Sequence, residues 1–173
     1  MLAVMNGDIS QASLLFKRYH TSVYSYLARI NRDSQIAQDM TQNVFEKMIK
    51  YRNSYQQQKC FKAWLFTIAR NVNIDHHRKK KYSITDEHVD MVDSAMGVHQ
   101  RMEQQENNKK LHMAMDRLAP EEKELLVLTK FERMKYHQVS TMMGMSESAL
   151  KVKAHRAMKK LRTILINELN YEY

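Results

Sequence analysis

The chain has 173 residues, of which 43% are hydrophobic, and this is enough to bury a core and excludes a disordered polypeptide. It contains only 3 glycines and 1 proline, too few for the turns of a β-protein, so an all-α fold is predicted. The formal net charge of +9 indicates a polyanionic partner, with nucleic acid as the first candidate.

The N-terminal ten residues lack the basic segment and the long apolar run of a secretory signal, and no apolar stretch is long enough to cross a membrane. The lone cysteine, Cys60, cannot form an internal disulfide, which agrees with a reducing compartment. We therefore expect a cytoplasmic protein without membrane insertion, in which Cys60 is a small, half-buried apolar residue.

A first helix is predicted within residues 7–30, with Asp8 or Ser10 as its cap. A hydrophobic stripe with helical spacing follows this cap. The side chains of the stripe are expected in the core, and they are Ala12, Leu15, Phe16, Tyr19, Val23, Leu27 and Ile30.

A second helix is predicted within residues 32–51, with Asp33 or Ser34 as its cap. Its core face carries Ala37, Met40, Val44, Met48 and Tyr51, with Phe45 and Ile49 alongside. Its other face carries four polar residues, Asp39, Gln42, Asn43 and Glu46. Residue type alone favours a solvated helix face for these four.

A third helix is predicted within residues 60–81, after a polar loop at 52–59, and its inward residues are Phe61, Trp64, Leu65, Ile68 and Val72. Its second half is rich in hydrogen-bonding and cationic side chains, namely Arg70, Asn71, Asn73, Asp75, His76, His77, Arg78, Lys79, Lys80 and Lys81. These residue types suit both phosphate and base contacts, although a solvated helix end whose cations complement the dipole explains them equally well. A metal site at the two histidines is disfavoured, because adjacent helical residues diverge by about 100° and no further ligand is suitably spaced.

Charge divides the chain into three parts. The net charge is +9 for residues 1–81, −5 for residues 82–106 and +5 for residues 107–173. Residues 82–106 show no clean periodicity in their first part, whereas the part from about Val98 could join the following helix. We therefore expect two small helical domains, 1–81 and 107–173, joined by a flexible acidic linker at 82–106.

The second domain carries the pattern of a helix-turn-helix. A helix that ends with Leu111, Met115 and Leu118 precedes another at 120–132, where Pro120 suits the first turn. Within residues 136–157, Val139 and Met143 supply the inner face of the short first helix, and the small Ser140 permits close crossing. Gly144 can take the left-handed turn conformation, and Met145 fills the core beside it. Ser146 can cap the second helix, and Leu150 packs back against the first. A plain αα-hairpin is the alternative.

The last helix combines an apolar stripe with a cationic flank. Residues 148–162 contain six lysines and arginines and no acidic residue. We interpret this helix as a recognition helix for the major groove of DNA. The residues near its N-terminus, where base edges are reached, are Ser146, Glu147, Ser148, Lys151 and Val152, and those expected to contact mostly phosphates are Lys153, His155, Arg156 and Lys159.

Three stretches of the chain together resemble a known family. DMTQNVFEKMIK, at 39–50, is similar to the pattern D-x-x-Q-[E/D]-x-F of a polymerase-binding helix, except that Asn43 replaces the acidic residue. FKAWLFTIARNVNID, at 61–75, resembles a helix that opens and reads the −10 promoter element, and LAPEEKELLVL together with residues 136–162 resembles a −35 reading domain. In this order the three blocks resemble an extracytoplasmic-function sigma factor of bacterial RNA polymerase, which keeps only the second and fourth sigma domains.

The resemblance implies partners and roles. Asp39, Gln42, Asn43 and Glu46 would dock on the clamp helices of the largest polymerase subunit, and the second domain would contact the flap of the second-largest subunit. The −10 element would be bound by Arg70, Asn71, Asn73, Asp75, His76, Arg78, Lys79 and Lys80. The loop at 53–59 would hold a flipped base, whereas Trp64 fits the core better than base stacking. An anti-sigma factor is a further expected partner, and the acidic linker residues Asp86, Glu87, Asp90 and Asp93 would mimic nucleic acid or serve as a passive connector.

Two other classes of function are weighed against this one. A stand-alone helix-turn-helix regulator would need a ligand pocket or a dimer seam near the N-terminus, where this chain has base-reading residue types instead. An enzyme acting on nucleic acid would need clustered carboxylates, zinc-ligand spacing or a glycine-rich phosphate loop, and the sequence has none of these. No catalytic residue, cofactor or metal is therefore expected.

Overall fold

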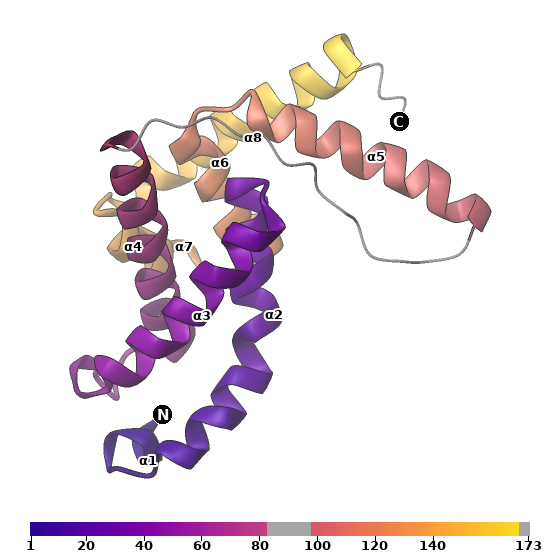
Figure 1. Cartoon of the computed structure of the whole chain (residues 1–173). Coiled ribbons are helices and arrows are strands. Elements are labelled where there is room, and N and C mark those ends of the chain that lie inside the picture. The colour runs from indigo at the N-terminus through magenta and orange to yellow at the C-terminus, as the bar shows by residue number, and fades with distance from the viewer. Residues whose placement is uncertain (83–97, 170–173) are drawn as a thin grey trace. The chain divides into compact units, whose positions relative to one another are not determined.

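The structure is a computed structural model that describes the backbone of residues 1–82 and 98–169 and the side chains of residues 1–79 and 106–167. Within these ranges every regular element is a helix, so the predicted all-α fold is confirmed (Figure 1). The chain divides into two compact units, Met1–Met91 and Val92–Tyr173. Within the described ranges, no helix is long and apolar enough to cross a lipid bilayer.

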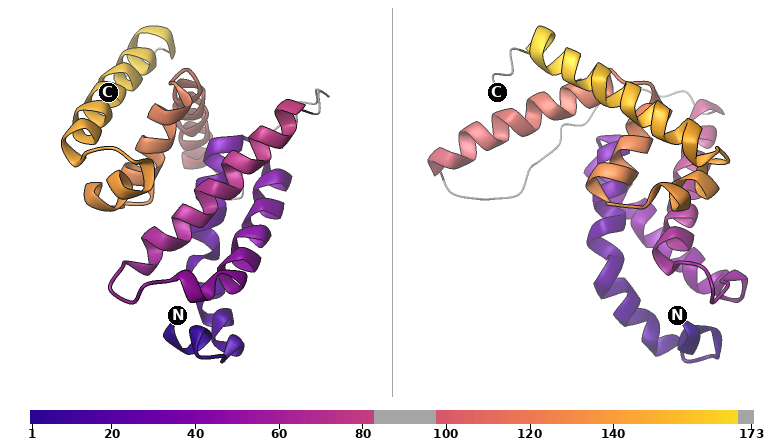
Figure 2. Two further views of the ribbon diagram at one scale, coloured as in Figure 1. Left: turned by 90° about the vertical axis from the view of Figure 1, so that its left-hand side faces the viewer. Right: turned by 180° about the vertical axis from the view of Figure 1, so that it is seen from behind.

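The first unit is built around three long helices that pack against one another, α2 (Ala12–Asn31), α3 (Ser34–Lys50) and α4 (Phe61–Tyr82) (Figure 2). Shorter elements complete it, namely α1 (Leu2–Met5), η1 (Ile9–Gln11) and η2 (Arg52–Ser54). The core is formed by fully buried side chains from all three long helices, among them Leu27, Val44 and Phe66. Each such side chain contributes roughly 1.5 to 3 kcal/mol of hydrophobic stabilisation.

Local signals explain how α3 begins. Asp33 is its N-cap, and one of its carboxylate oxygens accepts a hydrogen bond of 2.9 Å from the backbone N–H of Ile36, as predicted. The preceding residue, Arg32, has a left-handed backbone (φ 60°) that ends α2, so the two helices are joined by a two-residue turn.

Three expectations for the first unit are wrong. Neither Asp8 nor Ser10 caps α2, because the turn η1 intervenes and α2 begins only at Ala12. Phe16 and Tyr51 are exposed, the former against the ring of Phe45 and the latter just beyond the end of α3. Cys60 is also exposed, because it lies before the first residue of α4 and outside the buried stripe of that helix.

The second unit consists of α5 (Val98–Asp116), α6 (Pro120–Leu126), η3 (Val127–Phe131), α7 (Tyr136–Met143) and α8 (Glu147–Leu169). Helix α5 begins at Val98, so the later part of the expected linker does join the following helix. The acidic residues in the first part of the expected linker, Asp86, Glu87, Asp90 and Asp93, lie outside the described residues.

The expected continuous helix at 120–132 is instead an α-helix followed by a π-helical turn. Pro120 occupies the first turn, as predicted. The four consecutive residues Leu125–Leu128 are all buried, although four successive side chains point around most of a helix circumference. The segment can bury them because it is the central element of the unit, in contact with α5, α7 and α8.

The predicted helix-turn-helix is present, formed by α7 and α8 (Figure 2). Gly144 has the left-handed conformation expected of it (φ 66°), and the N–H of Met145 donates to the carbonyl oxygen of Ser140 at 3.1 Å. The hydroxyl of Ser146 accepts a hydrogen bond of 3.2 Å from the N–H of Ala149 and caps α8. Val139 and Leu150 are fully buried in the crossing. These contacts fix the direction in which α8 leaves the turn.

Candidate nucleic-acid interface

One polar face of α3 is entirely exposed. Asp39, Gln42, Asn43 and Glu46 are all solvent-accessible, while Val44 and Met48 on the opposite side of the helix are buried. Gln42 donates a hydrogen bond of 3.1 Å to the carboxylate of Glu46, so the two side chains lie side by side. The expected polymerase-binding residues therefore form one continuous polar face that a partner could contact without disturbing the core.

The second half of α4, in the first unit, carries polar side chains that are exposed or half-buried. Asn71, Arg78 and Lys79 are exposed, and Arg70, Asp75 and His76 are half-buried, whereas the side chain of Lys80 lies outside the described part. Asp75 forms ion pairs with Lys47 of α3 at 3.6 Å and with Arg78 at 3.3 Å. The carboxylate is thus a link between helices as well as part of the polar surface.

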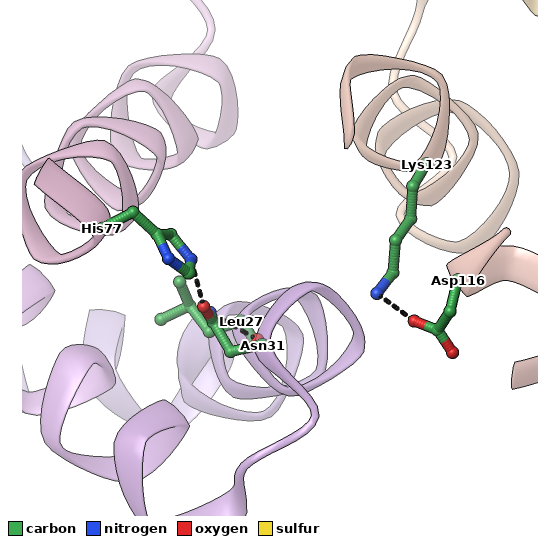
Figure 3. A network of polar contacts seen from close by, with 5 residues as sticks. All are labelled: Leu27, Asn31, His77, Asp116 and Lys123. Carbon is green, nitrogen blue, oxygen red and sulfur yellow. Dashed lines mark hydrogen bonds and ion pairs between the residues drawn. The ribbon is translucent and has the colours of Figure 1, made fainter. Parts of the chain in front are cut away.

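Asn73 has a different position from the other expected DNA-binding residues. It is only 8% exposed, and its carbonyl Oδ1 accepts a hydrogen bond of 2.8 Å from Nδ2 of Asn31 at the end of α2. The Oδ1 of the same Asn31 lies 2.7 Å from Nε2 of His77, one turn further along α4 (Figure 3). Asn73 is therefore held against α2 by its carbonyl oxygen, whereas most of the other expected DNA-binding residues of α4 are more exposed.

Aromatic side chains gather where the loop at 52–59 meets α4. Tyr55 of the loop lies 5.4 Å from Trp64 and 5.8 Å from Phe61 between ring centroids, and Tyr19 of α2 lies 5.1 Å from Phe61. Trp64 is half-buried, so it packs in this cluster while keeping part of its ring accessible. The hydroxyl of Tyr55 donates to the carbonyl oxygen of Lys59 at 2.8 Å and holds the loop closed.

The N-terminal turns of α8 project polar residues into solvent. Ser146, Glu147, Ser148, Lys151, Val152, His155 and Arg156 are all exposed, on the side of α8 away from its buried stripe. Lys151 pairs with Glu147 at 2.7 Å, and this hydrogen bond lowers the pKa of the Glu147 carboxyl below its usual range. The Glu147 carboxylate therefore stays charged at neutral pH, and the pair presents one donor and one acceptor side by side.

Two other cations of α8 are bound to the start of α6. Lys153 contacts the carboxylate of Glu121, and Lys160 lies 3.3 Å from that of Glu122. Glu122 also accepts a hydrogen bond of 3.1 Å from the N–H of Ala119, and this backbone donor is the main cause of its lowered pKa. Lys153, expected as a phosphate contact, thus already has an acidic partner within the fold.

A cationic pocket that sequence reasoning did not predict lies beside α8. It has a volume of about 510 Å³ and is lined by Arg117, Arg156, Lys159, Lys160, Thr163 and Ile164. Four of these six residues are cationic, and one of them, Lys160, already pairs with Glu122. Arg117 precedes α6 by three residues, and nothing in its local sequence connects it with α8.

The described residues contain no cluster of three or more histidine, cysteine, aspartate or glutamate side chains placed to hold a metal ion. The ring planes of His76 and His77 are at 90° to each other, with centroids 5.7 Å apart.

Two known protein families match successive parts of the chain. Residues 15–82 match the Sigma-70 region 2 family, and residues 108–161 match the family described as Sigma-70, region 4. The chain is 31% identical over 160 residues to the RNA polymerase sigma factor CarQ of Myxococcus xanthus, covering 91% of this chain and 90% of that protein. It is 29% identical over 160 residues to the ECF RNA polymerase sigma factor SigM of Bacillus subtilis, covering 91% and 97% of the two chains.

Two solved structures have a similar fold. The sigma factor RpoE, in its complex with the anti-sigma factor NepR from Bartonella quintana, has a TM-score of 0.75 at 19% identity, over 90% of this chain and 97% of that one. CnrH, in its complex with the cytosolic domain of CnrY, has a TM-score of 0.73 at 19% identity, over 95% and 94% of the two chains. At this level of identity the likeness is one of fold.

Proposed function

The chain belongs to the extracytoplasmic-function class of sigma-70 RNA polymerase sigma factors, and from this premise we propose how its two units divide the work of promoter recognition. The first unit binds core RNA polymerase and opens the −10 element, and the second unit reads the −35 element. The observation that carries this proposal is the ordered match of region 2 and region 4 to the two compact units.

Polymerase binding is assigned to the polar face of α3. Four adjacent exposed side chains, Asp39, Gln42, Asn43 and Glu46, offer two carboxylates and two amides without any buried neighbour having to move. The proposed contact is with the clamp helices of the largest subunit. Because Asn43 is neutral, the charged part of this contact comes from Asp39 and Glu46.

Promoter opening is assigned to the second half of α4 and the loop before it. Strand separation needs no covalent chemistry; it needs cations that hold one strand and surfaces on which unpaired bases rest, each capture contributing about 1 to 3 kcal/mol. Exposed Arg78 and Lys79 supply charge, and the aromatic cluster around Tyr55 and Trp64 supplies a stacking surface beside the loop. Asn71 and His76 are the proposed base-contacting groups between them.

The −35 element is assigned to α8. The N-terminal turns of this helix carry the exposed donor and acceptor pair Lys151 and Glu147, which suits major-groove base edges, since glutamate accepts from the cytosine amino group. The cationic pocket further along α8 extends the positive surface and fits a backbone phosphate. Binding of the second unit to the polymerase flap is part of the same proposal.

The protein is further proposed to act in the bacterial cytoplasm and to be held inactive by an anti-sigma factor. The support for this partner is the fold shared with two proteins whose structures were determined as complexes, one of them with an anti-sigma factor and the other with a cytosolic domain. Such a partner would cover the exposed polar faces of α3 and α8 that the active protein needs.

In vitro transcription tests the proposed function. A library of genomic fragments is transcribed by purified core RNA polymerase with and without the protein, and the new start sites are mapped by sequencing. We expect new starts that share two upstream motifs about two helical turns apart. Silence with core polymerase, alongside sequence-specific DNA binding by the protein alone, would contradict the division of roles and indicate a stand-alone regulator.

A variant with a defect in one unit sharpens this test. Arg78→Ala should lower the yield of open complexes at every new start while leaving the −35 motif of the recovered starts unchanged. Lys151→Ala should instead alter which −35 sequences are recovered. If both variants gave the same pattern of starts, the two units would not have separate roles.

A further inference from the structure

We propose that Asn31 is a positioning residue for promoter opening: its single carboxamide clamps Asn73 and His77 and so fixes the rotation of the DNA-reading half of α4. This inference rests on the role proposed above for α4. Asn31 is the last residue of α2 and belongs to neither the expected polymerase-binding set nor the expected DNA-binding set.

The hydrogen bonds around Asn31 leave one arrangement of its amide. Nδ2 donates to the carbonyl oxygen of Leu27 at 2.9 Å and to Oδ1 of Asn73 at 2.8 Å. Both acceptors are oxygens, so Oδ1 of Asn31 must face His77, and the Nε2 of His77 at 2.7 Å must be the donor. Turning the amide over would oppose its oxygen to the carbonyl oxygen of Leu27 and leave Nε2 of His77 facing an N–H group, so only this orientation makes all three bonds at once.

The clamp acts on one side of α4 only. Asn73 and His77 are one turn apart and therefore lie on the same face, which the bonds direct toward α2. At 100° per residue, Asn71 and Arg78 lie on the far side of the helix, and both are exposed. The neighbouring polar residues of α4 thus divide into an inward pair that binds Asn31 and outward residues that face a ligand. The rotation set by the inward pair decides where the outward ones point.

A second link in this region, an ion pair between α4 and α3, is weakened near DNA more than the bond between Asn31 and Asn73 is. Asp75 pairs with Lys47 of α3 at 3.6 Å, with side chains 43% and 29% exposed. An exposed ion pair is worth at most about 1 kcal/mol and is screened by salt, and phosphates compete for its lysine. The bond of Asn31 to Asn73 on α4 joins neutral groups that are partly buried, so an approaching polyanion does not weaken it in this way. The clamp therefore holds α4 under the conditions in which it meets DNA.

The experiment uses holoenzyme assembled from core polymerase and the full chain, on a promoter fragment mapped with wild-type protein. Open-complex formation is followed by 2-aminopurine fluorescence in the −10 region, affinity for core polymerase by fluorescence anisotropy, and folding by thermal denaturation. The variants are Asn31→Leu, which keeps the size and removes all three bonds, and Asn31→Asp. Asn108→Ala, at an exposed asparagine of α5, is the matched control, and Arg78→Ala reports on the role of α4 itself.

Asn31→Leu should form open complexes about five- to tenfold more slowly, with core affinity unchanged, because both hydrogen bonds that join Asn31 to α4 are lost. Asn31→Asp should recover part of the rate, because its carboxylate still accepts from His77 and the amide of Asn73 can turn to donate to it, whereas the bond to the carbonyl oxygen of Leu27 is lost. If Asn31 acted only by stabilising the fold, Asn31→Asp would not recover the rate of opening, because a carboxylate at the C-terminal end of α2 interacts unfavourably with the helix dipole.

The outcomes separate this inference from the proposed function. If Arg78→Ala slows opening while Asn31→Leu opens at the wild-type rate, the clamp is refuted and the role of α4 stands. If neither variant slows opening, the role of α4 itself is wrong. Equal losses of core affinity and opening in Asn31→Leu would show general destabilisation and refute positioning. Should Asn31→Leu fail to fold, His77→Leu removes one arm of the clamp alone and is expected to slow opening by a smaller factor.

Discussion

Removal of the Asp116 carboxylate should destabilise the second unit without affecting the first. Asp116 ends α5 and lies 2.7 Å from Nζ of Lys123 on α6, and the two side chains are only 19% and 11% exposed (Figure 3). In Asp116→Ala the ammonium of Lys123 stays in the packing between these helices without that carboxylate. Breaking a buried pair from one side costs about 3 to 5 kcal/mol, and we expect the lower value because both side chains keep some exposure.

The magnitude converts to a large change in melting temperature. The second unit has about 70 described residues, and for a domain of this size 1 kcal/mol corresponds to about 4 to 8 °C. A loss of about 3 kcal/mol should therefore lower the melting temperature of the unit by at least about 12 °C. Glu106→Ala is the matched control on the same helix, because its pair with Lys110 is exposed and should contribute less than about 1 kcal/mol.

Two spectroscopic probes separate the units. The chain has 1 tryptophan, Trp64, which lies in the first unit, whereas far-UV circular dichroism reports on the helices of both. We expect Asp116→Ala to shift the dichroism transition and to leave the Trp64 fluorescence transition unchanged. The double variant Asp116→Leu with Lys123→Met should regain most of the loss, because a well-packed apolar pair needs no charge compensation. A shift no larger than that of Glu106→Ala would refute the reasoning, since it would mean that water reaches the ammonium.

Three further predictions concern binding and pH. Lys151→Ala should weaken binding to cognate −35 DNA by about 1 to 3 kcal/mol and much less to unrelated DNA, in titrations that use Lys109→Ala as the control; a uniform loss would indicate a phosphate contact. Gln42→Ala should lower affinity for core polymerase without changing the melting temperature. Val44→Ala, at a buried position of the same helix, is the control and should lower the melting temperature. A large fall in the melting temperature of Gln42→Ala would contradict the exposed position assigned to Gln42. Glu122→Gln should lower the urea midpoint at pH 7 and lower it less at pH 3. The folded-state pKa of Glu122 is depressed, so its contribution is present above the pKa of the unfolded chain and is lost as pH falls through the folded value, and an equal deficit at both pH values would contradict this.

Helix boundaries and the turn of the helix-turn-helix could be predicted where a local signal sets them. Asp33 caps α3 through a bond to a residue three positions away, and Ser146 caps α8 in the same way. Gly144 adopts the left-handed conformation because a residue without a side chain does so at little cost. In each case the residue type and its immediate neighbours contain the whole physical cause.

The same reasoning fails where a second element intervenes. Asp8 and Ser10 have the right chemistry for a cap, yet the turn η1 delays the start of α2. Phe16 fits the apolar stripe of α2 but packs at its margin against Phe45 and His20 and remains exposed. Periodicity gives the angle of a side chain around its own helix, and it does not give the extent of the neighbour that covers it.

The polar face of α3 and the cationic flank of α8 belong to what the sequence by itself determined, because each is a pattern along one helix. Only the tertiary structure decided which polar residues turn inward. Asn31 meets Asn73 and His77 across separations of 42 and 46 residues, and Lys153 meets Glu121 across 32. The packing of whole helices determines which of these residues meet. A polar side chain can bond to protein, to DNA or to water, and its residue type does not reveal which of the three it bonds to. Composition and spacing could therefore locate the binding helices, but the assignment of each side chain to the fold or to a ligand depended on the helix that lies beside it.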